Sequence, residues 1–177
     1  EIHNNTKKIE LVFSNFLDFK NNAKILNNHE WLFSLNYIDF LRNIGTKVTI
    51  NKMLTYDSIK SRLDREQPLS FLEFNYMLLQ AYDFFYLYDN YECVLQIGGS
   101  DQWGNIVNGI ELIRKIKNGT AFALTSPLIT NNDGTKMGKT VNGSVWLSEN
   151  KLSNFEFFQF WRNVNDKDVE TFLKLFT

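Results

Sequence analysis

The 177-residue sequence is poor in cysteine, proline and histidine, and it carries no excess of either charge. The single Cys93 excludes an internal disulfide, which fits a reducing compartment. With only His3 and His29 beside that thiol, we expect no zinc site made by protein ligands alone. A net charge of −1, from 19 basic and 20 acidic residues, excludes nucleic-acid binding driven by bulk positive charge. No apolar run approaches the ~18–20 residues of a membrane span, and the polar start EIHNNTKKIE resembles no signal peptide, so we expect no membrane association.

Apolar residues, in contrast, are plentiful: they form 44% of the sequence, and 15% of it is aromatic. That composition excludes disorder, and the length predicts one domain or a large piece of one. Hydrophobic spacing predicts helices over residues 10–19, 37–44, 57–63, 69–88, 101–117, 153–161 and 166–176. A buried strand is predicted over 93–97 and another strand over 121–124, with a further strand end over 23–26. Strands that alternate with helices indicate an α/β fold with a parallel sheet.

The longest helical pattern opens with a predicted capping box of Ser70 and Glu73. On this helix Tyr76, Gln80 and Asp83 share one face, whereas most other sides are apolar. One interpretation is a polar stripe that faces solvent on a half-buried helix. The other is the wall of a polar pocket, because buried polar groups without partners cost about 1–3 kcal/mol each.

A second candidate site is the strand–turn–helix segment VLQIGGSDQWGN, residues 94–105. Gly98 and Gly99 remove side chains at the carboxyl end of the strand, which is where ligands bind in open parallel sheets. Three polar residues crowd the same strand end: Gln96, Asp101 and Gln102. A purely structural alternative is that Ser100 or Asp101 is the N-cap of the next helix.

A third candidate is the lysine-containing segment DGTKMGKT, residues 133–140. It does not match the phosphate-binding P-loop, because Gly134 and Gly138 enclose too few residues and no clear helix follows. The segment is therefore either ordinary solvated surface or a cationic clamp for a polyphosphate.

Taken in this order, the motifs resemble those of the catalytic domain of bacterial-type or organellar tyrosyl-tRNA synthetases, which are class I aminoacyl-tRNA synthetases. Further similar segments are NNHEW, FLRNIGTKVTINKML, SFLEFNYMLLQAYDF, LTSPLIT and FFQFWRN. The resemblance implies a partial Rossmann-like catalytic domain. Its expected parts are a mostly helical connecting insertion over 1–92, the second half of the nucleotide fold over 93–145, and the start of a helical region over 146–177.

The resemblance also implies roles for individual residues. Those implied to bind tyrosine are Tyr76, Gln80, Asp83, Gln96 and Gln102. Tyr76 and Gln80 would lie at the substrate's ammonium, and Asp83 would accept the hydrogen bond of its phenol. Those implied to bind the nucleotide are Gly98, Gly99, Asp101, Lys136 and Lys139. Lys136, Lys139 and Thr140 would be the catalytic signature that holds the leaving pyrophosphate. Asn28 and Trp31 are expected close behind the tyrosine pocket.

The implied ligands are L-tyrosine, ATP with its Mg²⁺, and tRNA(Tyr), with no metal of the protein's own. A homodimer is implied too, with Phe71, Leu72 and apolar residues near 31–41 at its interface. An ordinary core position is the alternative for Phe71.

The sequence does not contain the family's His-x-Gly-His-type ATP signature. We therefore expect an internal fragment that does not activate tyrosine by itself. Two alternatives stay open: a tryptophanyl-tRNA synthetase, which shares the fold but needs no phenol acceptor, and a non-catalytic dimerisation or RNA-binding module derived from a synthetase. The expected location is a bacterial cytoplasm or an organellar matrix.

Overall fold

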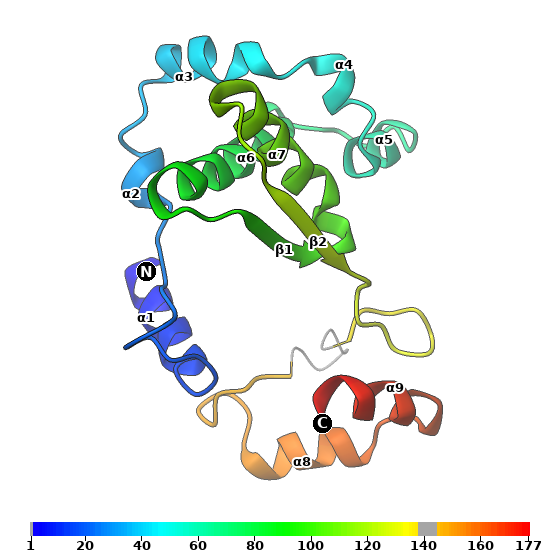
Figure 1. The fold of residues 1–177 in the computed structure, drawn as a ribbon. Helices are drawn as coiled ribbons and strands as arrows, with labels where there is room; N and C mark the ends of the chain where they lie inside the picture. The colour runs from blue at the N-terminus through cyan, green and yellow to red at the C-terminus, as the bar shows by residue number, and fades with distance from the viewer. Residues whose placement is uncertain (1, 138–144) are drawn as a thin grey trace. The chain divides into compact units, whose positions relative to one another are not determined.

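The computed structural model describes residues 2–137 and 145–177, which form two compact units. The central unit is Asn27–Leu128, and the terminal unit joins the chain up to Leu26 with Ile129–Thr177 (Figure 1).

The central unit contains a small sheet and a set of helices. Its helices are α2 (His29–Leu32), α3 (Tyr37–Asn43), α4 (Ile50–Met53), α5 (Asp57–Leu63), α6 (Phe71–Tyr91) and α7 (Trp103–Lys117). Strands β1 (Leu95–Gly99) and β2 (Phe122–Ser126) pair in parallel, with Leu95 opposite Phe122. Short 3₁₀ turns cover Gly45–Lys47 and Ser100–Gln102. The predicted α/β class and the parallel pairing are confirmed.

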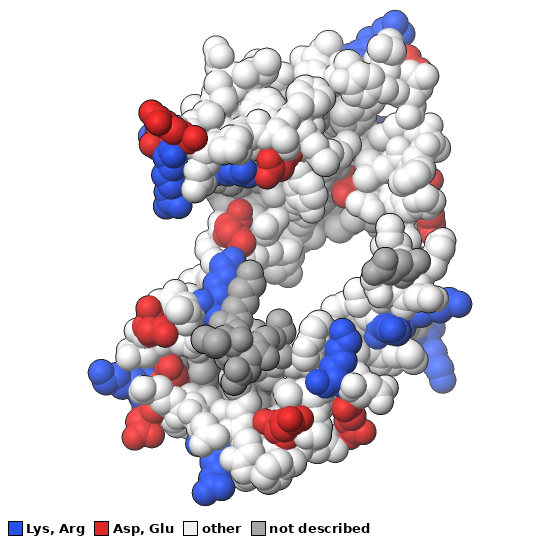
Figure 2. Space-filling view, turned by 180° about the vertical axis from the view of Figure 1, so that it is seen from behind, with Lys and Arg blue, Asp and Glu red and all other residues white. Residues whose placement is uncertain are grey.

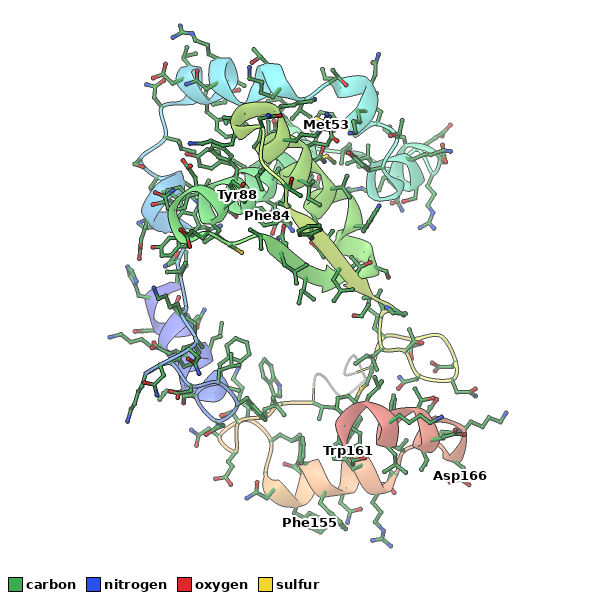
Figure 3. All side chains as sticks on the ribbon, in the orientation of Figure 1. Met53, Phe84, Tyr88, Phe155, Trp161 and Asp166 are labelled. Atoms are coloured by element: carbon green, nitrogen blue, oxygen red, sulfur yellow. The ribbon has the colours of Figure 1, made fainter. Side chains whose placement is uncertain are left out.

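Helices α6 and α7 pack tightly against each other, and α7 also contacts both strands. Phe84 of α6 points into this contact (Figure 3), where it meets Ile106 and Ile113 of α7 and Ala121 before β2. Gly109 permits the close approach of the helices, because a Cβ at this position would lie 2.8 Å from the Phe84 ring. The contact fixes the beginning of α7 relative to α6.

Helix α6 begins with the capping box that the sequence predicted. Ser70 Oγ accepts a hydrogen bond from the Glu73 backbone N–H at 3.2 Å, and Glu73 Oε2 accepts one from the Ser70 N–H at 2.9 Å. Arg62 Nη1 donates to the other Glu73 oxygen at 2.7 Å. The cap satisfies backbone donors that the first helical turn leaves without partners.

The terminal unit contains α1 (Ile2–Phe13), α8 (Asn154–Arg162) and α9 (Asp166–Phe176). Trp161 joins α8 to α9: its ring lies edge-on to those of Phe172 and Phe176, at centroid distances of 6.1 and 5.1 Å (Figure 3). Such edge-to-face pairs are the geometry that aromatic quadrupoles favour. The two predicted carboxy-terminal helices are confirmed.

Three predicted elements differ in the structure. The helix expected over 10–19 is Ile2–Phe13, and the chain then turns, with the Asp18 carboxylate accepting bonds from Lys20 N and Asn21 Nδ2. Such local side-chain bonds compete with helix formation. Residues 23–26 are not a strand, since no described segment pairs with them. Strand β1 begins at Leu95 and is not buried, because Ile97 is 64% exposed in this chain.

The described surface carries charges of both signs. Figure 2 shows lysine, arginine, aspartate and glutamate side chains singly or in small groups between broad uncharged areas. The view agrees with the near-zero net charge of the sequence.

Candidate functional site

The carboxylate of Asp83 is held in place by hydrogen bonds from two side chains. Trp31 Nε1 donates to its Oδ1 at 2.7 Å, and Asn28 Nδ2 donates to its Oδ2 at 3.0 Å. Trp31 is itself buried, and its ring stacks on that of Tyr86 with the centroids 4.4 Å apart. The structure therefore places both expected neighbours at Asp83, and the carboxylate is held by protein donors on a half-buried face of α6.

The electrostatics of Asp83 follow from this position. Burial raises the pKa of its carboxyl, and the hydrogen bonds from Asn28 and Trp31 act in the opposite direction. Two carboxylate oxygens offer about four lone-pair sites, so the two present donors leave capacity for another. A ligand hydroxyl is a suitable further donor.

The polar stripe of α6 is divided between solvent and protein. Tyr76 is 60% exposed in this chain, whereas Gln80 and Asp83 are half-buried and bonded to other elements. The solvent-facing interpretation thus describes Tyr76 alone. Gln80 and Asp83 fit the other interpretation, in which this face of α6 is the wall of a polar pocket.

Asn105 connects that wall to the strand–turn–helix segment. Its Nδ2 donates to Gln80 Oε1 at 3.0 Å and to Gln102 Oε1 at 3.2 Å. Gln80 and Gln102, predicted separately from two motifs, are thereby held together. The sequence pattern alone gave Asn105 no role, although an asparagine one helical turn after Gln102 is a signal that could have identified it.

The strand end is tightly packed at both glycines. A Cβ at Gly99 would lie 2.7 Å from Asp101 Oδ1 and 3.0 Å from Leu128 Cδ2, and one at Gly98 would lie 3.1 Å from Gln102 Cβ. The glycines therefore make room for the side chains of the candidate site itself. Any larger residue would displace Asp101 or Gln102.

Asp101 and Ser100 do not cap α7, which corrects the structural alternative. Gln102 is the N-cap residue and makes no side-chain cap bond, and Ser100 and Asp101 lie before it in the 3₁₀ turn between the strand and the helix. The turn carries the exposed Asp101 beside the carboxyl end of β1.

Gln96, the second residue of β1, has an unusual side-chain oxygen. Its Oε1 is buried without a hydrogen-bond partner among the described residues. An acceptor in this state costs about 1–3 kcal/mol, so a donor from a ligand would be favourable there.

The lysine-containing segment begins with an ordered turn in the terminal unit. Thr130 and Lys136 form an antiparallel bridge, and Asp133 Oδ1 accepts the Thr135 N–H at 2.9 Å. Gly134 adopts a positive φ of 80°, which favours glycine. Lys136 is exposed, whereas Lys139 and Thr140 lie outside the described residues.

The described residues also hold a cavity of about 390 Å³ in the terminal unit. Asn131, Asn163, Asp168 and Phe172 are among the residues that line it, and none of the predicted tyrosine contacts does. The side chains anchored around Asp83 are the better candidate for a binding site, because specific polar contacts define a recognition site better than volume does.

None of the helices in residues 2–137 and 145–177 combines the length and apolar character that a membrane crossing requires. Within the same ranges, no three histidine, cysteine, aspartate or glutamate side chains are grouped as metal ligands.

A family model described as "tRNA synthetases class I (W and Y)" matches residues 1–177, and the chain belongs to this family of class I tRNA synthetases. The predicted Rossmann-like class I fold is thereby confirmed.

Individual relatives narrow the similarity to the tyrosine branch. Curated proteins named tyrosine–tRNA ligase from Roseobacter denitrificans and Orientia tsutsugamushi are 59% and 56% identical over 99% of this chain. The chain spans 43% of the length of each. Solved C-terminally truncated mitochondrial tyrosyl-tRNA synthetases from Coccidioides posadasii and Aspergillus nidulans match with a TM-score of 0.72 at 28% and 30% identity, covering 97% of this chain and 51% of those chains.

Proposed function

We propose that the chain is part of a tyrosine–tRNA ligase, which activates L-tyrosine with ATP to tyrosyl-adenylate and transfers the tyrosyl group to tRNA(Tyr). The observation that carries the proposal is the Asp83 carboxylate, held by Trp31 and Asn28 on a half-buried wall. The relatives named tyrosine–tRNA ligase support the same assignment.

Asp83 supplies the selection for tyrosine. The phenol O–H of the substrate donates to the carboxylate, which the hydrogen bonds from Asn28 and Trp31 hold in place. Phenylalanine would leave this buried acceptor without its donor. Sites built to bind a substrate hydroxyl reject the analogue that lacks it by ~10⁴–10⁵-fold, a range for which tyrosyl-tRNA synthetases are themselves the standard example.

Adenylate formation depends on positioning and on charge. The carboxylate of tyrosine attacks the α-phosphorus of ATP, and pyrophosphate leaves, so the protein must align the two and stabilise developing negative charge. In the proposal Gln80, Gln96 and Gln102 line the tyrosine site, and Gly98, Gly99 and Asp101 face the nucleotide. Lys136, Lys139 and Thr140 hold the pyrophosphate, and ATP arrives with Mg²⁺.

The proposal extends to the assembly and the compartment. The protein would be a homodimer in a bacterial cytoplasm or an organellar matrix, and its contacts would include Phe71 and Leu72. Because the matched relatives are longer, the 177 residues alone are expected to give no tyrosine-dependent exchange of pyrophosphate into ATP.

The test uses a full-length ligase that carries these 177 residues. Tyrosine-dependent pyrophosphate exchange is expected from the wild type. Asp83→Asn should lower kcat/KM for tyrosine by about 10- to 10²-fold, as expected when a hydrogen bond to a charged group worth about 1.5–3 kcal/mol is weakened, and should lower the preference over phenylalanine.

Asp89→Asn is the matched control. Asp89 lies on the same helix but is not part of the polar stripe, and its carboxylate forms an ion pair with Lys117 at 2.6 Å. It should leave the kinetics unchanged. Activation of tryptophan in place of tyrosine would support the tryptophanyl alternative. Absence of exchange with either amino acid would support a non-catalytic module.

A further inference from the structure

Asn105 occupies a central place among the amides of the site. Its carboxamide nitrogen, which has two N–H groups to donate, lies 3.0 Å from Gln80 Oε1 on α6 and 3.2 Å from Gln102 Oε1 before α7. One side chain therefore uses its whole donor capacity on two residues that the proposed function places in the tyrosine pocket.

These bonds determine which way each glutamine points. An unrestrained carboxamide can exchange its oxygen and nitrogen by a half-turn, at little cost. With Oε1 directed to Asn105, the NH₂ groups of Gln80 and Gln102 are directed away from it. Both glutamines then present N–H donors, and one remaining oxygen lone pair each, to their surroundings.

Asn105 is itself held rigidly. The neighbouring Ile106 is almost fully buried in the α6–α7 contact, and a Cβ at Gly104 would lie 3.1 Å from the Tyr56 ring. The first turn of α7 is therefore packed on two sides. A side chain on so rigid a base can orient its neighbours, as precise sites require.

We propose that Asn105 is a positioning residue that fixes the carboxamide orientation of Gln80 and Gln102, so that both offer N–H donors to oxygens of the bound amino acid or adenylate. The inference rests on the proposed function. It assigns Asn105 no contact with the reacting atoms.

Two substitutions separate orientation from packing, in a full-length ligase that carries this chain. Asn105→Ala leaves both glutamines free to turn, and we expect kcat/KM for tyrosine in pyrophosphate exchange to fall about tenfold. Asn105→Asp keeps nearly the same shape but offers only acceptors, which attract the glutamine NH₂ groups and reverse both amides. We expect this variant to lower kcat/KM for tyrosine further, by up to ~10²-fold, a loss typical of misplaced substrate-binding groups.

Which of the two variants loses more kcat/KM distinguishes an orienting role of Asn105 from a space-filling one. If Asn105 only filled space, the near-isosteric Asn105→Asp would be milder than Asn105→Ala, and that result, or two variants within twofold of the wild type, would overturn the inference. Thermal midpoints should stay close to the wild-type value for both.

Asn90, near the end of α6, provides the matched control. Its Nδ2 donates to the Tyr86 carbonyl at 3.0 Å, a bond within one helix that reaches neither glutamine. Asn90→Ala removes the same carboxamide and should leave kcat/KM within twofold of the wild-type value. A wild type without exchange would overturn the proposed function and this inference with it, whereas an active wild type with unaffected Asn105 variants would overturn the inference alone.

Discussion

At the scale of single residues, Glu73 links the stability of the central unit to pH. The Arg62 guanidinium and the Ser70 donors lower the pKa of the Glu73 carboxyl to about 2, from an ordinary value of 4.5. A carboxyl whose pKa is depressed by folding stabilises the fold above its unfolded pKa, and this stabilisation is lost as the pH falls through the folded value. We expect the thermal midpoint of the wild type to fall more steeply than that of Glu73→Gln between about pH 4.5 and pH 2.

The second capping box supplies a comparison for that experiment. Glu156 makes the same bonds with Ser153 at the start of α8, and these bonds also lower its pKa. No arginine is among the causes of its shift, so Glu156→Gln should change the pH dependence less. Equal slopes for the wild type and Glu73→Gln in thermal scans at several pH values would contradict the prediction.

The sequence was informative about single residues where the signal is local. Ser70 with Glu73, and the helical spacing of Tyr76, Gln80 and Asp83, depend on a few neighbouring residues, and the structure shows the cap and the shared helix as predicted. The partners of Asp83 lie more than fifty residues away in the sequence, so periodicity could not identify them. Asn28 and Trp31 were expected there only through the family resemblance.

At the scale of elements, the α6–α7 contact depends on the absence of a side chain. Gly109→Ala would place a methyl group 2.8–2.9 Å from Phe84 atoms in the buried contact, and overpacking of this kind costs about 1–3 kcal/mol. Urea denaturation should therefore show a lower free energy of unfolding.

Gly45→Ala is the control for this prediction. The nearest atom to a Cβ at Gly45 is Leu41 Cδ2 at 3.6 Å, which is an ordinary contact, and Gly45 is not among the residues with positive φ. This substitution should be neutral or stabilise slightly, because alanine restricts the unfolded chain. A Gly109→Ala variant as stable as Gly45→Ala would show that the helices can separate without cost.

Most helices were predicted well, because the spacing of apolar residues along a helix is a local pattern. The helices over Asp57–Leu63 and Asp166–Phe176 agree with their predicted bounds, and α6 differs only at its ends. The segment over 23–26 failed as a strand because a strand exists only through its hydrogen-bonded neighbour, which a local pattern does not contain. The failed prediction of burial at Ile97 has a related explanation. Its hydrophobicity predicted a buried side chain, but the described residues do not include a layer that covers that face of β1.

At the scale of the whole molecule, Phe71 and Leu72 test the proposed dimer. Both are strongly exposed at the start of α6, at 69% and 70%, and large exposed apolar side chains that lie together are typical of interaction sites. In a full-length ligase with these residues, Phe71→Asp should shift the protein from dimer to monomer in sedimentation velocity. The substitution adds an acidic residue to the first turn of a capped helix, which is electrostatically favourable, so the helix itself should persist.

Phe155 is closely matched to Phe71 and lies in the terminal unit. It is 68% exposed on the outer side of α8 (Figure 3), in the first turn of a helix that also begins with a serine capping box. Phe155→Asp therefore makes the same chemical change in an equivalent local setting, and it should leave the dimer intact. If both variants remain dimeric, the dimer contact does not depend on the beginning of α6; if both become monomeric, the loss reflects a general effect of the new charge and the assignment of Phe71 fails. Only separation of the two variants supports an interface at Phe71 and Leu72.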